Sequence, residues 1–278
     1  MRAKRGYVDT RDGQVHFRSA GDAEAPPVVL LHWTPASGRQ YEPVLVALAA
    51  RGWRAIAPDL LGYGRSDPRP ADHDLPAFAA SMDEALAALG VAAAPVVGGH
   101  VSACVAVELA RLRGARVPRL VLDGCPLWPP EMRAQMARFV AGSGPQVSAD
   151  GSHRTLPWDR VEAFVREWRP GFAATDADLP WFYGLVIDFL ETRFASSARA
   201  LAAYDLAAAL PTLRVPTLFL TASTDPLRGH HDAARSLVAG SLEHRFEGLH
   251  PLHDPARADE YAAVLDRFLR ADAEEIPA

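Results

Sequence analysis

The stretch that decides the fold is Val96-Val97-Gly98-Gly99-His100-Val101-Ser102-Ala103, where a short apolar run passes directly into a helical pattern. Small residues surround one large polar side chain, that of His100. A sharp turn from strand to helix presses two backbone segments together, so it needs small neighbours and leaves its central residue strained and exposed. We therefore expect His100 to project from the top of a sheet, beside the backbone N–H groups that begin the next helix.

Outward from this turn, short apolar runs alternate with helical patterns. The predicted strands are 27–33, 54–58, 95–98, 120–122, 217–221 and 242–246, and the predicted helices are 41–50, 75–89, 101–113 and 256–270. Continuous apolar runs indicate strands that are buried on both faces, and the alternation indicates right-handed crossovers. The sequence thus predicts an α/β fold with a mostly parallel sheet flanked by helices, and residues 7–17 predict an antiparallel hairpin at one edge.

The strand–helix alternation stops between residues 128 and 210, where helical patterns and aromatic residues take over. We expect a core formed by residues 1–127 and 211–278 and an inserted helical cap formed by residues 128–210. Aromatic side chains of the cap that face the sheet would line an apolar pocket. The candidates are Trp128, Trp158, Trp181, Phe182 and Tyr183.

Composition excludes several classes of function. A net charge of -5 over 278 residues, with no dense run of Lys or Arg, argues against nucleic-acid and membrane partners. Apolar stretches are too short for a secretory signal or a membrane span, which favours a cytoplasmic monomer or homodimer. Cys104 and Cys125 are too few for a disulfide framework or a cysteine-based metal site, so we expect both to be buried and reduced.

Three further polar sites follow predicted strands, at the sheet edge where α/β proteins bind ligands. His32-Trp33-Thr34-Pro35 follows one strand, Asp225 follows another, and His250 follows the last. In the triad of this kind of hydrolase, the acid follows the nucleophile turn in the chain and the histidine follows the acid. Asp123, which also follows a strand, is an alternative acid.

Together these residues resemble the α/β-hydrolase superfamily, in particular the capped branch with epoxide hydrolases, haloalkane dehalogenases, esterases and carbon–carbon bond hydrolases. Residues 32–35 are similar to the family's oxyanion turn, with Trp33 in place of a glycine, and residues 59–66 are similar to its glycine-containing loop. The resemblance implies that Asp225 and His250 are the acid and base. It also implies an oxyanion site formed by N–H groups near Trp33 or Thr34 and on Val101, with His32 orienting the loop and no cofactor.

His100 is the departure from the family pattern, since it occupies the nucleophile position. Dehalogenase and epoxide-hydrolase chemistry needs a carboxylate there, whereas a neutral imidazole can accept an acyl group. We therefore expect hydrolysis of an ester, lactone, thioester or C–C bond in a small hydrophobic or aromatic carbonyl compound, with His250 as base oriented by Asp225. On this assignment, His100→Ala abolishes activity and His100→Ser restores a conventional esterase.

Two alternatives remain open. His100 and His250 could act as an acid/base pair in a lyase, cyclase, decarboxylase or isomerase. The chain could instead bind a small molecule without catalysis. No metal site is predicted, and His230, His231 and His253 are expected to be solvated surface residues.

Overall fold

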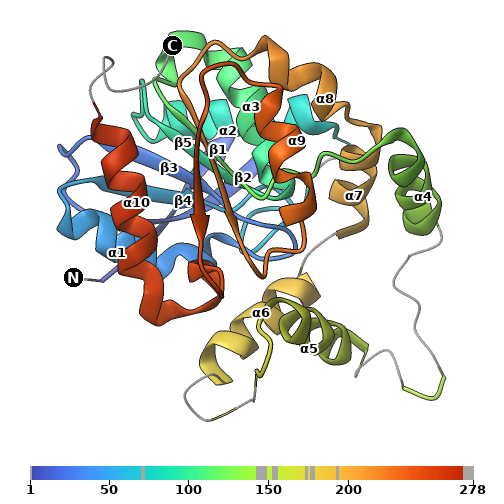
Figure 1. Ribbon diagram of the computed structural model, residues 1–278. Helices are drawn as coiled ribbons and strands as arrows, with labels where there is room; N and C mark the ends of the chain where they lie inside the picture. Colours follow the sequence, from blue (N-terminus) through green and yellow to red (C-terminus); the bar gives the residue numbers. More distant parts are fainter. Residues whose placement is uncertain are drawn as a thin grey trace.

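The protein is described by a computed structural model that covers residues 2–69, 73–141, 149–151, 156–172, 175, 179–191 and 194–271. Its centre is an eight-stranded sheet in the order β1-β2-β4-β3-β5-β6-β7-β8 (Figure 1). The strands are β1 (Lys4–Thr10), β2 (Gly13–Ala20), β3 (Pro27–Leu31), β4 (Arg54–Pro58), β5 (Val96–Gly99), β6 (Leu120–Asp123), β7 (Thr217–Ala222) and β8 (Leu242–Phe246).

The pairing of the strands confirms the predicted fold class. β1 and β2 form an antiparallel hairpin at one edge, β2 pairs antiparallel with β4, and all remaining neighbours are parallel. Gly99, the last residue of β5, pairs with Asp123, the last residue of β6. The carboxyl ends of these two central strands therefore meet at one point of the sheet edge.

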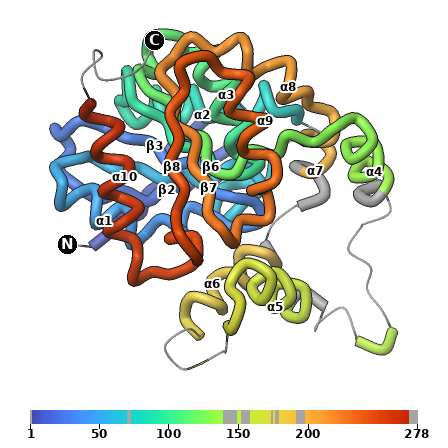
Figure 2. Tube along the Cα trace, viewed as in Figure 1, coloured from blue at the N-terminus to red at the C-terminus, as the bar shows by residue number. Residues whose placement is uncertain are grey.

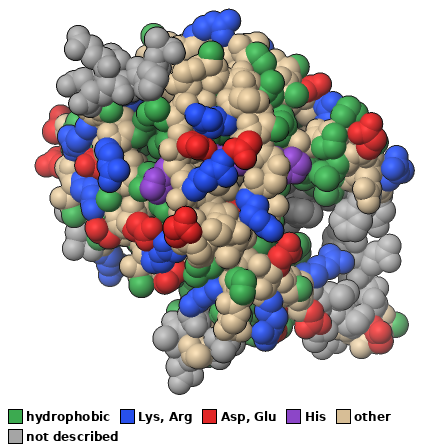
Figure 3. All heavy atoms as spheres, in the orientation of Figure 1, with side chains coloured by type: hydrophobic (Ala, Val, Ile, Leu, Met, Phe, Trp, Pro, Cys, Tyr) green, Lys and Arg blue, Asp and Glu red, His purple; other side chains and the backbone are tan. Residues whose placement is uncertain are grey.

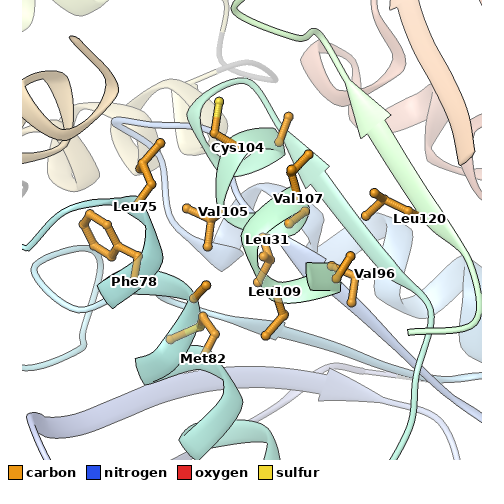
Figure 4. Close-up of a cluster of buried hydrophobic side chains, with 14 of the residues drawn as sticks. Leu31, Leu75, Phe78, Met82, Val96, Cys104, Val105, Val107, Leu109 and Leu120 are labelled. Carbon is orange, nitrogen blue, oxygen red and sulfur yellow. The ribbon is translucent and has the colours of Figure 1, made fainter. Parts of the chain in front are cut away.

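Helices cover both faces of the sheet, as continuous apolar strands require. One face carries α1 (Glu42–Ala50) and α10 (Ala258–Arg270), and the other carries α2 (Leu75–Ala88) and α3 (Val101–Arg113) (Figure 1). The short helix α9 (His231–Ser236), which connects β7 to β8 in the chain, packs on the same face as α3. Figure 4 shows Leu31 and Val96 of the sheet close to Phe78 of α2 and Val105 of α3, all of them at most 1% exposed. Full burial of such a side chain is worth about 2 kcal/mol.

The helical insertion between β6 and β7 has two parts. Its helices are α4 (Pro130–Ala141), α5 (Leu156–Trp168), α6 (Leu179–Glu191), α7 (Phe194–Ala203) and α8 (Leu206–Ala209). Leu201 of α7 and Leu206 of α8 join the main core. By contrast, α5 and α6 pack on each other through their own apolar cluster, which contains Val165 and Phe182, and they stand apart from the other helices in Figure 2.

A buried carboxylate connects this outer pair of helices to the core. Asp188 of α6 accepts a hydrogen bond from the Ser37 hydroxyl at 2.8 Å and lies 3.6 Å from the Arg39 guanidinium. Burial raises the pKa of Asp188 to about 6, although Arg39 and Ser37 oppose this shift. The position of α6 over the sheet edge therefore depends on a carboxylate that has lost most of its hydration.

The surface shows no dominant charge. Acidic and basic side chains are interspersed on the face drawn in Figure 3, and neither sign forms a continuous patch there. Among the described helices, none has both the length and the apolar character needed to cross a membrane. Cys104 and Cys125 are buried and not disulfide-bonded, which confirms the expectation for them.

Candidate active site

His100 forms the strained turn between β5 and α3. Its φ and ψ are 52° and -119°, and it is the only non-glycine residue with positive φ in the described part of the chain. The His100 amide donates to the carbonyl of Asp123 at 2.8 Å. At Gly98 a Cβ atom would lie 2.3 Å from the carbonyl oxygen of Ser102, so the close approach of strand and helix requires glycine. The turn predicted from small residues is present, and strain of this kind is typical of functional sites.

Asp225, which follows β7, contacts the His100 ring. Its Oδ2 lies 3.4 Å from His100 Nε2, and its Oδ1 accepts the Leu227 amide at 2.6 Å. Room for this contact comes from Gly124, where a Cβ would lie 2.6 Å from His100 Cδ2. Burial by itself would raise the pKa of Asp225, but the neighbouring His100 and then His250 lower it to about 2. The ionised carboxylate thus holds an N–H at Nε2, and Nδ1 of His100 has no hydrogen-bond partner among the residues that the structure describes.

His250, the expected base, has both ring nitrogens engaged. The Leu252 amide donates to Nδ1 at 3.2 Å, so the proton of the neutral ring is on Nε2, which lies 3.0 Å from Asp123 Oδ1. The second oxygen of Asp123 accepts the Tyr261 hydroxyl at 2.7 Å. His250 and Asp123 are both fully buried. This arrangement leaves no nitrogen of His250 available to a substrate.

The pairing of acid and base therefore differs from the expected one. Asp225 was predicted to orient His250, but it contacts His100, and the alternative acid Asp123 holds His250. The cause is local: the backbone amide of Leu252 fixes the orientation of the His250 ring, so that Nε2 faces the end of β6. No hydrogen bond joins His100 and His250 among the described residues.

The same cluster brings possible metal ligands together, namely Asp123, Asp225 and His250, whose ligand atoms lie within 4.8 Å of one another. A histidine ligand must offer a lone pair to the ion. In His250 one nitrogen accepts a backbone N–H and the other carries the proton that faces Asp123. This donor set suits a hydrogen-bonded pair and does not suit a cation.

Trp33 covers the His100 ring. The two rings are parallel, with an interplanar angle of 8° and a centroid distance of 3.9 Å. A Cβ at position 99 would lie 1.8 Å from two ring atoms of Trp33, so the indole fits only because residue 99 is glycine. Trp33, which stands where the family's oxyanion turn was expected to have a glycine, thus has room only beside the glycine at position 99. As a result, the His100 side chain is only 10% exposed.

The other residues predicted for the oxyanion site lie around this stack. His32 is fully buried; its Nδ1 donates to the Trp33 carbonyl at 2.9 Å, and its Nε2 accepts the Leu60 amide at 3.1 Å. Burial lowers the pKa of His32, which favours the neutral ring that these two bonds need. Val101 is the first residue of α3, so its N–H has no acceptor within the helix. Thr34 follows Trp33 at the edge of the cavity described next.

An apolar cavity lies between the outer helices and the sheet edge. It is lined by Trp33, Thr34, Pro35, Ala36, Gln40, Val161, Phe164, Val165, Trp168, Trp181, Leu185, Leu252 and His253. Of the five aromatic residues proposed for the pocket, only Trp181 lines it. Trp158 and Phe182 pack inside the α5–α6 pair, Tyr183 is 47% exposed, and Trp128 packs against the main core.

Most residues that line this cavity were not predicted from the sequence, and two of them, Trp168 and His253, matter most for its shape and polarity. Trp168 of α5 was not among the predicted pocket residues, although the amphipathic pattern of 156–168 could have identified the buried face of this helix. His253 was expected at the surface, but it is 4% exposed, and His231 is 2% exposed. No local signal marks His253, because its burial depends on helices that lie far away in the sequence.

Comparison with known proteins places the chain in a family. It matches the α/β hydrolase fold family over residues 26–251 and belongs to that family. A haloalkane dehalogenase of Mycobacterium marinum is 45% identical over 60 residues, but this stretch is 22% of the present chain and only 20% of the dehalogenase. A non-heme chloroperoxidase of Streptomyces lividans is 26% identical over 272 residues, which cover 88% of this chain and 92% of the relative.

Solved structures share the fold at lower identity. The enol-lactonase from Burkholderia xenovorans superposes with a TM-score of 0.78, covering 96% of this chain and 100% of that chain at 19% identity. At this level of identity the likeness concerns the fold alone. The residues at the elbow and around it must therefore carry any argument about activity.

Proposed function

We propose that this protein hydrolyses an ester or lactone of a small hydrophobic or aromatic compound, with His100 as the reacting residue. One observation carries the proposal: His100 occupies the strained elbow, and Asp225 holds its Nε2 while Nδ1 stays free. A neutral imidazole is a competent nucleophile toward carbonyl carbon. The lactonase named among the structural relatives supports the choice of a carbonyl substrate for a protein of this fold.

The proposed reaction needs one water and no other co-reactant. His100 Nδ1 forms a bond to the carbonyl carbon, and the carbonyl oxygen takes the negative charge beside the N–H groups of Val101 and Thr34. The C–O bond to the leaving group then breaks, and the leaving alkoxide takes a proton from water. The hydroxide left by this proton transfer adds to the acyl carbon of the acyl-imidazolium, the C–N bond breaks, and the carboxylic acid leaves with neutral His100 restored. Asp225 stays ionised and balances the positive charge on the ring.

Two other reactions receive less support. Alkyl transfer, as in haloalkane dehalogenases, would leave an alkyl-imidazolium that water does not cleave, so a histidine at the elbow stops that cycle. An acid/base pair of His100 and His250 needs a free nitrogen on each ring, and His250 has none.

Binding without catalysis is the second candidate, and one observation favours it. The indole of Trp33 lies against the His100 ring, so a carbonyl carbon reaches Nδ1 only if the indole moves or the substrate approaches past its edge. A protein that binds ligands in the apolar cavity without reacting would have no need of that movement.

A panel of esters and lactones tests the proposal. We expect the unmodified protein to hydrolyse 4-nitrophenyl butyrate, 4-nitrophenyl benzoate or an aryl lactone, and we expect His100→Ala to lose this activity. His230→Ala, which removes a histidine outside the site, is the matched control and should retain the full rate. Unchanged turnover in His100→Ala would remove His100 from the mechanism, and binding without product across the panel would favour the non-catalytic candidate.

A further inference from the structure

Aromatic rings of the apolar cavity form a row of nearly parallel rings with one ring perpendicular to it. Phe164 stacks on Trp168 with an interplanar angle of 18°, and Trp168 stacks on His253 with an angle of 12°. The Trp33 ring lies at the end of this row and is nearly perpendicular to it, with interplanar angles of 87° to Trp168 and 85° to His253. Rings stacked in a row present their edges to the side, and a ring edge favours the face of another aromatic ring in an edge-to-face contact, so the cavity favours a planar aromatic ligand.

The charge of the wall also restricts the ligand. None of the described residues that line the cavity is an Asp, Glu, Lys or Arg. A charged group in this position would lose its water without gaining an ionic partner, which is strongly unfavourable. The cavity therefore favours an uncharged ligand.

His253 supplies the polar feature of the wall. Neither of its ring nitrogens has a hydrogen-bond partner within the described structure, and the same holds for Nε1 of Trp33, which lies beside it. Burial, followed by the neighbouring His250 and His100, holds the pKa of His253 well below its ordinary value. The neutral ring therefore offers one N–H donor and one acceptor. Buried polar groups without partners are rare in native proteins, and two in one wall point to a ligand that pairs with them.

We propose that His253 is the hydrogen-bonding residue of a ligand site in this cavity, and that the site takes a planar, uncharged aromatic compound with a carbonyl or hydroxyl group. The binding site itself does not depend on the proposed hydrolysis. The further statement that this ligand is the substrate rests on the proposed function. His253 is a specificity-determining residue in this account, whereas His100 is the reacting one.

Space for such a ligand comes from a neighbouring cavity. A wider cavity of about 250 Å³ shares four wall residues with the aromatic one, namely Gln40, Trp181, Leu185 and Leu252. Arg39, Glu42 and Asp188 also line the wider cavity, so the uncharged ring system that contacts His253 belongs in the aromatic cavity, and the wider cavity adds space at its entrance between α6 and the core.

Calorimetric titration with two matched probes tests the inference. 2-Acetylnaphthalene is planar, uncharged and carries one carbonyl, and 2-ethylnaphthalene has nearly the same shape without the oxygen. We expect the unmodified protein to bind the ketone about fivefold to tenfold more tightly, because one net hydrogen bond is worth a factor of this size. Equal affinity for the two probes, or no binding of either, would overturn the inference without any variant being made.

Substitution of the histidine then locates the effect. His253→Phe keeps a stacking ring of similar size but removes both polar nitrogens, so it should bind the two probes equally. His253→Asn, with a donor and an acceptor, should recover part of the preference, and His230→Phe should leave it unchanged. A preference that survives His253→Phe would contradict the role of His253. Neither probe is an ester, so failure of binding and failure of hydrolysis are separate results.

Discussion

His100 with Asp225 and His250 with Asp123 are two imidazole–carboxylate pairs at the carboxyl ends of adjacent strands, and they differ in how many nitrogens are engaged. In the first pair the carboxylate engages Nε2 only, and the His100 side chain is 10% exposed. In the second pair a carboxylate and a backbone amide engage both nitrogens, and the ring is fully buried. The same two residue types thus form the proposed reacting unit in one place and a fully hydrogen-bonded, buried unit in the other, and one backbone N–H, that of Leu252, accounts for the second engaged nitrogen.

Replacement of His100 should have the largest effect. His100→Ala removes the only free imidazole nitrogen of the two pairs, and we expect kcat/KM for the best ester to fall by about 1,000-fold or more. The sequence alone suggested that His100→Ser would restore an esterase. The observed pairing predicts that it does not, because Nε2 of His250 faces Asp123 and cannot take the serine proton. Steady-state kinetics of both variants check this, and a fully active serine variant would show that His250 is not fixed.

Asp123→Asn should act mainly on stability. This change removes the negative charge that accepts hydrogen bonds from the neutral His250 ring and from Tyr261, and a hydrogen bond to a charged group is worth about 1.5–3 kcal/mol. We expect a lower midpoint in urea unfolding and a rate within about tenfold of the unmodified protein. If Asp123→Asn had normal stability but no activity, the His250–Asp123 pair would be the one needed for the reaction, contrary to the roles assigned here.

Asp225→Asn should act mainly on the rate. The amide cannot balance a positive charge on His100, so we expect about a 100-fold loss in kcat with little change in KM. Its stability effect should also depend on pH. Because the folded pKa of Asp225 is lowered to about 2, its stabilising contribution is present above about pH 4 and disappears as the pH falls toward 2. Unfolding of both proteins across this range measures the difference, which should close at low pH.

Asp188 sharpens the comparison because it is a buried carboxylate without an imidazole partner. Its folded pKa of about 6 lies above the ordinary value, so its protonated form is favoured by folding. The free energy of unfolding should therefore fall by about 2 kcal/mol as the pH rises from 4 to 6 and beyond. Asp188→Asn should lack this decline, as thermal unfolding at a series of pH values can show. The same slope in both proteins would argue that another group titrates.

Much of the fold was predictable from local patterns. The apolar runs gave β4 and β8 at their observed bounds and the other predicted strands to within two residues, and the small residues around position 100 gave the elbow. These features were accessible because they depend on neighbouring residues. The side chain that covers His100 also left a signal in the sequence, since Trp33 departs from the family pattern, and the small residue that makes room for it, Gly99, lies in the predicted elbow.

The pairing of acids and bases was not predictable in the same way. Asp123 and Asp225 both follow strands, and the choice between them depends on the orientation of the His250 ring, which a backbone amide sets. The burial of His253 depends on Trp168, a residue of α5 that packs against it across the insertion. Sequence periodicity identifies a helix but not the distant ring against which it packs.

The most direct test of the free nitrogen of His100 is to trap the acyl group that it should carry. The protein would be mixed with 4-nitrophenyl butyrate, quenched in acid within one turnover, digested and analysed by mass spectrometry. We predict a transient butyryl group on His100 that is absent from His100→Ala and present in Asp123→Asn. Hydrolysis by the unmodified protein with no acyl group on His100, or with the group on another residue, would contradict the account.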